Sequence, residues 1–262
     1  MENKEIKIVL LAGKGLSTRV MFHALKNDPI SVGFNISAVI LEEKPSSWHL
    51  FRRRVHKLGL LKVSGQVMFL LFNKILTQTS TSRISELSKQ FKLNENEIPK
   101  EFLRKVKSIN SKETIEILRQ LSPDAVVVNG TRIISKKVLA SIAAPFINTH
   151  MGITPKYRGI HCGYWALANN DKENCGVTVH LVDEGIDTGG VLFQDTISPT
   201  HKDNFNTYPV HQIAKAIPLM KKAIIAASEN SLVVKKGVGP SGLWYHPTLW
   251  GYLWRWVFKG IK

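Results

Sequence analysis

An amide, an imidazole and a carboxylate could act together in this sequence. Asn148 and His150 stand two positions apart at the end of the apolar run 144–147, which predicts a buried strand. Residues i and i+2 of a strand share a face, so the two side chains should lie together. Asp187 follows in a glycine-rich loop, 182–190. An amide donor beside an imidazole that a carboxylate orients can polarise a carbonyl and move protons, which suits acyl transfer without a covalent enzyme intermediate.

The surrounding pattern predicts a doubly wound, mostly parallel α/β sheet, because apolar strands alternate with helices. Strands are expected at 6–12, 36–41, 124–129, 146–149, 176–182 and 190–197. Helices are expected at 17–27, 111–121, 135–142 and 208–227, with Ser111 and Ser135 as caps. In such sheets ligands bind beyond the carboxyl ends of the strands, where Asn129, Gly130 and the 148–150 pair fall.

Three stretches carry a resemblance to a known family. They are Pro123–Ser135, Asn148–Gly159 (Asn-Thr-His-Met-Gly-Ile-Thr-Pro-Lys-Tyr-Arg-Gly) and Val177–Leu192, which contains Val-Asp-Glu-Gly-Ile-Asp-Thr-Gly-Gly. Together they resemble the folate-dependent formyltransferases, a family that includes the glycinamide ribonucleotide, methionyl-tRNA and sugar N-formyltransferases. The resemblance runs from about residue 106 to 198, is faint before that and is absent from 44–100 and from 231 onward.

The resemblance implies a Rossmann-like formyltransferase fold and transfer of a formyl group to a primary amine. The implied co-substrate is 10-formyltetrahydrofolate, with no metal. By the same resemblance, Asn148 donates to the developing oxyanion. His150 donates to that oxygen or shuttles the proton, and Asp187 holds the histidine and favours its charged form.

The resemblance also implies where the two substrates bind. The residues expected to hold folate, largely through the backbone, are Thr131, Arg132, Ile133, Ile134, Val182, Asp183, Glu184, Gly185 and Ile186. The residues expected at the amine substrate are Gly13, Lys14, Gly15, Ser17, Tyr157, Arg158 and Gly159. The first four form a glycine turn at a helix N-terminus, a geometry that favours anions. Many relatives carry Pro-Ser after the histidine, whereas this chain has Met151 and Gly152.

Size and composition fit one substantial globular core. The chain has 262 residues, 44% of them hydrophobic. We expect a catalytic domain at 1–230 with a helical insertion at 44–100, followed by an aromatic amphipathic extension at 231–262. Two cysteines form no disulfide framework, which indicates the cytoplasm. Cys162 follows His161, but adjacent side chains on a strand point apart, so we interpret it as a small packing residue.

The net charge of +16 is compatible with RNA, an anionic membrane or phosphorylated substrates, although a lysine-rich surface accounts for much of it. Three arginines, 52–54, precede the nearly all-apolar stretch 58–76, whose polar stripe is Lys62, Gln66 and Asn73. That stretch is shorter and more polar than a spanning helix. The tail repeats apolar residues at helical spacing: Trp250, Leu253, Trp254, Val257, Phe258 and Ile261.

Both segments either pack on each other, pack on a second subunit of a homodimer, or contact an anionic membrane surface. The last alternative would place the enzyme peripherally on the inner face of the membrane.

The acceptor is expected to be an amino sugar on a nucleotide or lipid carrier. A methionyl-tRNA enzyme carries a C-terminal RNA-contacting barrel, whereas the residues after 231 are aromatic, so nucleic acid is not expected. The loop 13–18 only partly resembles the phosphate loop of the glycinamide ribonucleotide enzymes. Those two activities are the alternatives, and a non-catalytic, membrane-associated scaffold that retains the fold is a third.

Overall fold

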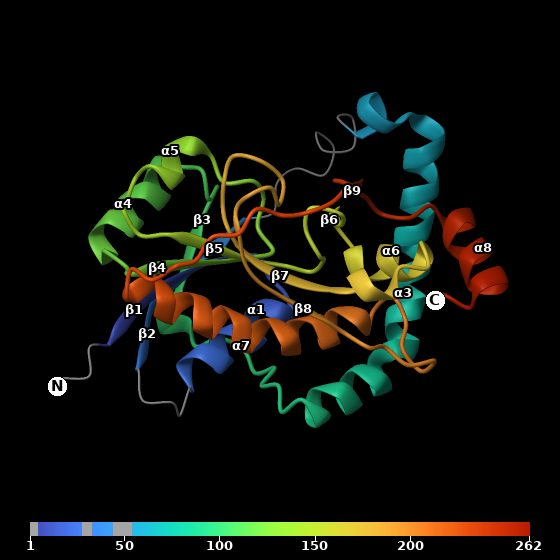
Figure 1. Cartoon of the computed structure of the whole chain (residues 1–262), viewed down its shortest axis with the longest axis horizontal. Helices are drawn as coiled ribbons and strands as arrows, with labels where there is room; N and C mark the ends of the chain where they lie inside the picture. Colours follow the sequence, from blue (N-terminus) through green and yellow to red (C-terminus); the bar gives the residue numbers. More distant parts are fainter. Residues whose placement is uncertain (1–4, 28–32, 44–53) are drawn as a thin grey trace.

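A seven-stranded, mostly parallel sheet forms the centre of the molecule (Figure 1). The computed structural model describes residues 5–27, 33–43 and 54–262. The strand order is β3-β2-β1-β4-β5-β7-β8. The first five strands in this order pair in parallel, β7 is antiparallel to β5, and β8 is antiparallel to β7. The strands are β1 Ile6–Ala12, β2 Phe34–Glu42, β3 Leu103–Val106, β4 Ala125–Asn129, β5 Phe146–His150, β7 Gly176–Leu181 and β8 Val191–Thr196. The predicted fold class is confirmed.

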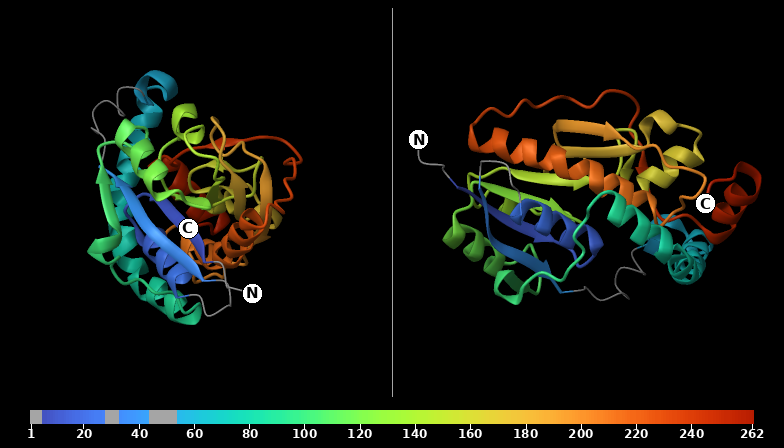
Figure 2. Two further views of the ribbon diagram at one scale, coloured as in Figure 1. Left: turned by 90° about the vertical axis from the view of Figure 1, so that its left-hand side faces the viewer. Right: turned by 90° about the horizontal axis from the view of Figure 1, so that it is seen from below.

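Helices cover both faces of the sheet (Figures 1 and 2). They are α1 Leu16–Lys26 and α7 Tyr208–Ser228 on one face, and α4 Lys112–Leu121 and α5 Lys136–Leu139 on the other. A hydrophobic core lies on each face of the sheet, and alternate residues of β1 point into the two cores. Ile8 and Leu10 face α1 and α7, whereas Val9 and Leu11 face α4 and α5. This burial on both faces explains why β1 is a continuous apolar run rather than an alternating one.

The two predicted helix caps have different outcomes. The Ser111 hydroxyl accepts from the Thr114 amide and caps α4, as predicted. Ser135 stands at the start of α5, but its side chain makes no capping bond. Its amide donates instead to Asn110 Oδ1 at 2.7 Å, which ties it to another segment. The helix ends at Leu139 rather than at the predicted residue 142.

A third group of helices packs at one end of the sheet. It consists of α3 Leu60–Gln90, α6 Cys162–Ala168 and α8 Leu249–Lys259. They share an aromatic cluster in which Phe69 lies 4.9 Å from Phe205 and 5.0 Å from Tyr252, ring centre to ring centre. Helix α3 lies within the 44–100 stretch, for which helical structure was expected. The part of that insertion at 44–53, including Arg52 and Arg53, lies outside the described residues.

The C-terminal segment is joined to the centre of the molecule. Strand β9, Leu243–Trp244, pairs in parallel with β6, Arg158–Gly159, which belongs to the loop after His150. The Trp244 ring stacks on Tyr157 and on Trp165. Two short 3-10 helices, Lys100–Phe102 and Lys172–Asn174, complete the described elements.

The strand order reverses between β1 and β4, the position at which open α/β sheets bind ligands. Asn129 at the end of β4 donates to Ser17 Oγ in the first turn of α1 at 3.3 Å. The carboxyl end of β5, with Asn148 and His150, lies next to β4. The fold therefore gathers the predicted site at one edge of the sheet.

Candidate active site

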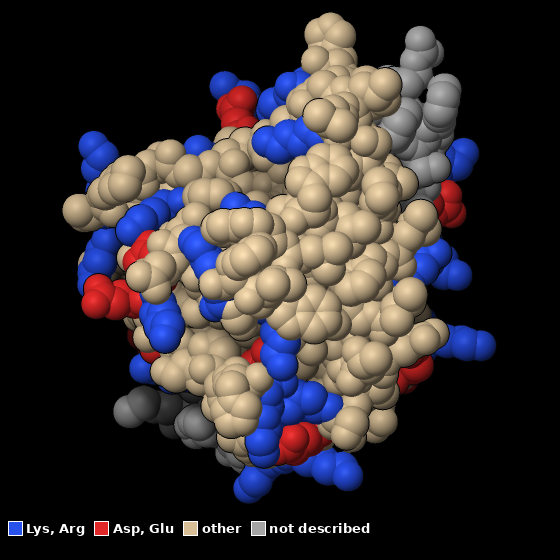
Figure 3. Space-filling view, turned by 90° about the vertical axis from the view of Figure 1, so that its right-hand side faces the viewer, with Lys and Arg blue, Asp and Glu red and all other residues tan. Residues whose placement is uncertain are grey.

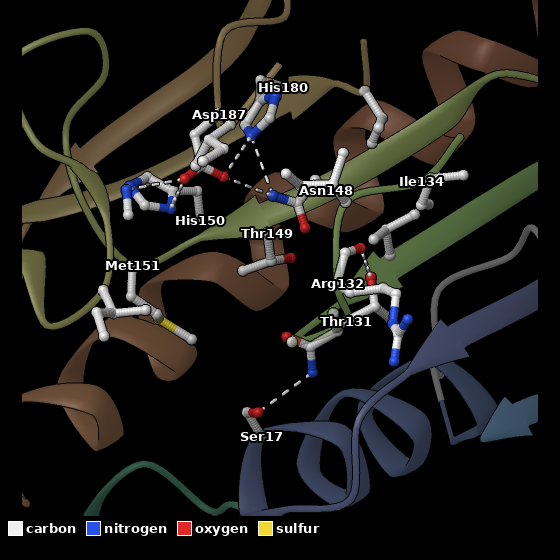
Figure 4. Close-up of a pocket in the computed structure, with 18 of the residues that line it drawn as sticks. Ser17, Thr131, Arg132, Ile134, Asn148, Thr149, His150, Met151, His180 and Asp187 are labelled. Carbon is white, nitrogen blue, oxygen red and sulfur yellow. Dashed lines mark hydrogen bonds and ion pairs between the residues drawn. The ribbon is translucent and has the colours of Figure 1, made fainter. Parts of the chain in front are cut away.

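Asn148, His150 and Asp187 come together at the end of β5 (Figure 4). Asp187 Oδ2 lies 3.3 Å from His150 Nδ1, and Asp187 Oδ1 lies 3.4 Å from Asn148 Nδ2. The carboxylate thus links the two side chains, which share one face of the strand. The grouping that the sequence predicted is present in the structure.

A second histidine, which the sequence analysis did not select, completes the group. His180 on β7 stands directly opposite Asn148 in the antiparallel register. Its Nε2 lies 3.0 Å from Asn148 Nδ2, and its Nδ1 lies 2.7 Å from the Leu181 carbonyl oxygen. Because a carbonyl only accepts, Nδ1 carries the proton and Nε2 accepts from the amide of Asn148. His180 therefore fixes the orientation of that amide.

The His150 ring is held from both sides. Its Nε2 donates to the carbonyl oxygen of Tyr157 at 2.7 Å, which leaves Nδ1 facing Asp187. Burial lowers the pKa of His150 below its usual value, although the Asp187 carboxylate acts to raise it. Burial therefore favours the neutral ring, and a proton that reaches Nδ1 would lie beside a carboxylate that stabilises the resulting charge.

Asp187 is fixed by its backbone and by its neighbours. It adopts a left-handed conformation, with φ 51°, and its Oδ2 accepts from the Gly159 amide at 2.9 Å. Arg158 donates to the carbonyl oxygen of Ile186 at 3.0 Å and holds the same loop. Burial acts to raise the pKa of Asp187, but His180, His150 and the Gly159 amide together hold it below its usual range. Asp187 is accordingly the charged member of the group.

These side chains line a cavity of about 450 Å³. Its wall includes eight of the nine residues predicted to bind folate: Thr131, Arg132, Ile133, Ile134, Val182, Asp183, Gly185 and Ile186. The ninth, Glu184, is not among the residues that line the cavity. Glu184 is exposed outside the cavity and pairs with Lys136 at 3.5 Å. It follows Asp183 in a turn, and the carboxylate of Asp183 is itself bound by Thr188.

Arg132 is held beside this wall by an ion pair. Its Nε donates to Glu42 Oε2 at 2.7 Å, and Oε1 of the same carboxylate accepts from the Ile109 amide. Asn110 supports the neighbouring backbone, because its amide donates to the Ile133 carbonyl oxygen at 3.0 Å. The 131–134 segment is thus held in place before any ligand binds.

The residues predicted at the amine substrate divide into two sets. Ser17 and Gly159 line the cavity, whereas Gly13, Lys14, Gly15, Tyr157 and Arg158 do not. Lys14 and Gly15 are exposed at the start of α1. Gly13 is structural, because a Cβ there would lie 2.3 Å from the Gly130 carbonyl oxygen.

Tyr157 and Arg158 support the site instead of lining it. The Tyr157 hydroxyl turns away and donates to Asp171 at 2.8 Å, while its carbonyl oxygen holds His150. Arg158 is engaged with the Asp187 loop through Ile186. The structure therefore does not bring these two side chains into the cavity, because residues of one loop that are adjacent in sequence need not point the same way.

Residues that the sequence analysis did not select also line the cavity, among them the polar residues Thr149, His161 and Gln212. The Thr149 hydroxyl is buried and has no hydrogen-bond partner within the described part of the chain. His161 Nε2 lies 2.9 Å from His246 Nδ1, and burial lowers the pKa of His161 to about 3, with His246 acting in the same direction. No local sequence pattern marks these residues, because α7 and the C-terminal segment bring their neighbours from far along the chain.

Gly152 and Cys162 are in contact behind the catalytic histidine. A Cβ at position 152 would lie 2.4 Å from Cys162 Cβ and 2.5 Å from the Tyr157 carbonyl oxygen. Cys162 is buried at the start of α6, and burial raises the pKa of its thiol well above its usual value. The prediction of a packing role fits this position, although the residue begins a helix rather than lying on a strand.

Comparisons with known proteins agree with this geometry. A model of the formyl transferase family matches residues 56–216, more than half of the chain. A methionyl-tRNA formyltransferase from Finegoldia magna is 41% identical over 92 residues, which cover 35% of this chain and 29% of the relative. The chain spans less than half the length of the curated relatives that it matches most strongly.

Two solved structures share the fold. Glycinamide ribonucleotide transformylase 1 from Symbiobacterium toebii has a TM-score of 0.57 and 17% identity, over 90% of this chain and 93% of that one. A sugar N-formyltransferase from Shewanella sp. has a TM-score of 0.54 and 16% identity, over 91% of this chain and 76% of that one. At this identity the likeness extends to the fold.

Proposed function

Because the chain belongs to the formyl transferase family, we propose that it transfers a formyl group from 10-formyltetrahydrofolate to a primary amine. The observation that carries the proposal is the meeting of Asn148, His150 and Asp187 on the wall of one cavity. An amide donor, a free imidazole base and a charged carboxylate are the groups that this reaction requires.

In the proposed reaction each group has one step. The amine nitrogen attacks the formyl carbon, and negative charge develops on the formyl oxygen. One hydrogen of Asn148 Nδ2 is bound by His180, and the other makes only the long 3.4 Å contact with Asp187, so it is available to the oxyanion. His150 Nδ1 takes the proton that the amine loses, and Asp187 stabilises the imidazolium. Collapse of the intermediate breaks the bond between the formyl carbon and the folate nitrogen, and the departing nitrogen takes the proton from the His150 imidazolium, which yields tetrahydrofolate and the neutral ring.

The wall formed by 131–134 and 182–186 is the proposed folate site. It offers backbone donors and acceptors held by Asn110 and by the Arg132–Glu42 pair. A pterin ring carries donors and acceptors along one edge, as a peptide does, and backbone groups of fixed orientation suit such an edge.

The proposed acceptor is an amino sugar on a nucleotide or lipid carrier. The part of the cavity away from the folate wall carries polar groups on Thr149, His161 and Gln212, which suit a hydroxyl-rich acceptor. Ser17 brings the first turn of α1 to the cavity, and a helix N-terminus favours an anion such as a carrier phosphate.

Methionyl-tRNA is the second candidate acceptor. The 41% identical relative from Finegoldia magna is a methionyl-tRNA formyltransferase, and a net charge of +16 suits a nucleic acid. The two candidates differ in salt dependence, because tRNA binding through many phosphates weakens steeply as salt rises, whereas binding of a small sugar does not.

The test is incubation with 10-formyltetrahydrofolate and a panel of acceptors, following release of tetrahydrofolate. The panel contains amino-sugar nucleotides, a lipid-linked amino sugar, glycinamide ribonucleotide and methionyl-tRNA. Turnover with one acceptor that is lost in Asn148→Ala and kept in a control, Asn27→Ala, supports the proposal. Asn27 is exposed at the end of α1 and is not among the residues that line the cavity. Folate binding without turnover on any acceptor would leave a non-catalytic protein that keeps the fold.

We also infer a cytoplasmic location for this activity. Cys162 and Cys175 are both free and buried, so neither forms a disulfide in the described structure. A reduced folate co-substrate fits the same compartment. Fractionation of cells that express the tagged chain would test the inference, since recovery from an extracytoplasmic fraction would contradict it.

A further inference from the structure

Helix α3 exposes a broad apolar side in its first turns, and it directs polar side chains inward beside the buried Val63, Phe69 and Leu76. Three polar side chains, spaced seven residues apart, point inward. Gln66 donates to the His246 carbonyl oxygen at 2.9 Å, Asn73 pairs with Asn206 at 3.0 Å, and Ser80 pairs with Asn204 at 3.0 Å. The outward side of the first turns is apolar; its exposed residues are Leu60, Leu61, Val67, Met68, Leu70, Leu71 and Ile75. A helix facing water normally has polar side chains on its outward side.

Helix α8 repeats this arrangement. Tyr252 is fully buried in the aromatic cluster, and Arg255 folds inward over the Trp165 ring, 5.2 Å from its centre. The predicted apolar face points outward instead; its exposed residues are Trp250, Leu253, Trp254, Val257 and Phe258. Phe258 is 71% exposed and Val257 73%, which is unusual for side chains of this size.

The two helices pack side by side and present one continuous surface, here called the α3–α8 face. The Trp250 ring lies on Gly65, where a Cβ would approach it to 2.2 Å, and Trp256 contacts Phe72. The sequence alternative in which the two segments pack on each other is therefore correct for their inner sides, yet it leaves their outer sides uncovered. Figure 3 shows this side of the molecule as a broad tan area with blue Lys and Arg side chains at its edges. Exposed apolar surfaces of this kind mark interaction sites.

Charge on these segments has one sign only. Between residues 54 and 85, and again from 230 to 262, the sequence contains no aspartate or glutamate. The basic residues there are Arg54, Lys57, Lys62, Lys74, Arg83, Lys235, Lys236, Arg255, Lys259 and Lys262. Lys62 and Lys74 are exposed among the apolar residues of α3, and Lys259 lies over the Trp254 ring. The partner must therefore be apolar inside and negatively charged at its surface.

An anionic lipid bilayer fits these requirements, and the other occupants do not. A symmetric pair of copies would set like charges against each other, because each copy brings the same patch to the interface. Within the described chain, α3 is the one helix long and apolar enough to cross a membrane. However, hydrogen bonds along the length of α3 attach the helix to the domain; they are made by Gln66, Asn73 and Ser80. Further along the helix, Arg83 pairs with the buried Asp203 at 2.9 Å. The helix is thus held flat against the protein, with its apolar side outward.

We propose that the α3–α8 face is a docking surface for an anionic lipid bilayer, in which the tryptophans and aliphatic side chains enter the interfacial layer and the lysines contact headgroups. The surface is also connected to the active-site cavity. Gln66 holds the His246 carbonyl, and the His246 ring binds His161, which lines the cavity. Docking does not depend on the proposed reaction, so it can be tested without an acceptor.

The test is sedimentation with vesicles of phosphatidylglycerol and phosphatidylcholine against vesicles of phosphatidylcholine alone, together with tryptophan quenching by brominated lipid. We expect binding to the anionic vesicles and quenching by the brominated ones. The double variant Leu71→Glu, Val257→Glu should lose roughly tenfold or more in affinity. Lys62→Gln and Lys74→Gln should each lose about fivefold, the effect of one basic residue near such a surface.

The matched control is Val233→Glu, Val238→Glu, which adds the same charge at two exposed valines outside the face. Its vesicle binding should equal that of the unaltered chain. Circular dichroism and thermal unfolding of every variant distinguish misfolding from lost docking. If the double variant fails to fold, the lysine variants, which change only exposed side chains, test the proposal. Full recovery in the soluble fraction with all vesicles would overturn the proposal, as would salt-reversible binding without quenching. A dimer in light scattering that dissociates in the Leu71→Glu, Val257→Glu variant would identify a second copy as the partner instead.

Discussion

The proposed active site at the carboxyl end of β5, here called the catalytic edge, and the α3–α8 face both bury polar side chains, but they differ in what they expose. At the catalytic edge, Asn148, His150 and Asp187 satisfy one another beside a cavity, and apolar residues lie in the core. Along α3, Gln66 and Asn73 are satisfied inside, whereas Leu71 and its neighbours face outward. The first arrangement orients polar groups toward a cavity that can hold a small molecule. The second leaves apolar side chains exposed to water, which is unfavourable.

Buried hydrogen bonds therefore have different effects in the two regions. At the catalytic edge the hydrogen bonds set protonation, since they leave His150 Nδ1 free beside a charged carboxylate. Along α3 the bonds are neutral and set orientation, since they fix which side of the helix faces out. Substitutions should therefore change rate at the first region and stability or docking at the second.

The largest effect is expected at the catalytic base. His150→Ala removes the group that accepts the amine proton, so the formyl transfer rate should fall by about 10²–10⁴ while thermal unfolding changes little. Steady-state release of tetrahydrofolate measures the rate, and His201→Ala, at an exposed histidine, is the control. Turnover within a few-fold of normal would show that the two regions do not differ in the way described.

The next effect concerns pH. The pKa of His150 is lowered, so activity that needs the free base persists below the usual histidine range and is lost as pH falls through that lowered value. Asp187→Asn removes the charge that raises this pKa, so the acid limb should move lower and the rate should fall about a hundredfold. Asparagine tolerates the left-handed backbone at this position. The pH dependence of kcat/KM measures both changes, and an unshifted acid limb would reduce Asp187 to a structural role.

The third effect concerns Gly152, two positions after His150. Gly152→Ser adds a side chain whose Cβ would meet Cys162 and the Tyr157 carbonyl, so stability should fall by about 1–3 kcal/mol. Chemical denaturation measures this loss. Gly15→Ser is the control, because no atom lies within 4 Å of a Cβ there and serine is favoured at a helix N-cap. Equal stability of the two variants would mean that the loop relaxes freely.

The smallest effect distinguishes the two sides of α3. Gln66→Leu leaves the His246 carbonyl oxygen without its donor, so stability should fall by about 1 kcal/mol despite the added apolar surface. Gln78→Leu makes the same change at an exposed position of the helix and should be close to neutral. Denaturant unfolding of the pair gives the comparison directly. If the Gln66→Leu variant were more stable than the Gln78→Leu variant, the inward hydrogen bonds of α3 would not determine which side of the helix faces the protein.

Local pattern predicted much of the fold and the centre of the site. The strands ending at Asn129 and His150 were predicted to within a few residues, because apolar runs bounded by turns are local signals. The i, i+2 spacing of Asn148 and His150 was sufficient to place them on one face. His180 was missed because its place opposite Asn148 depends on the register of β7 against β5, which no local pattern encodes.

The orientation of α3 shows the same limit. Sequence pattern identified Gln66 and Asn73 as a stripe on a helix, but an amphipathic pattern does not say which side faces the protein. The structure decided this through partners 133 and 180 positions away, Asn206 and His246. The same holds for Tyr157 and Arg158, whose loop is fixed by pairing with Leu243 and Trp244.

The sequence alone therefore determined which segments form strands and helices and which residue types could perform the transfer, because propensity, periodicity and i, i+2 geometry act over a few residues. The tertiary structure alone decided that His180 orients Asn148, that Glu184 leaves the cavity, and that α3 and α8 expose their apolar sides. The physical reason is that a buried polar group needs a hydrogen-bond partner, and in this chain those partners come from distant segments.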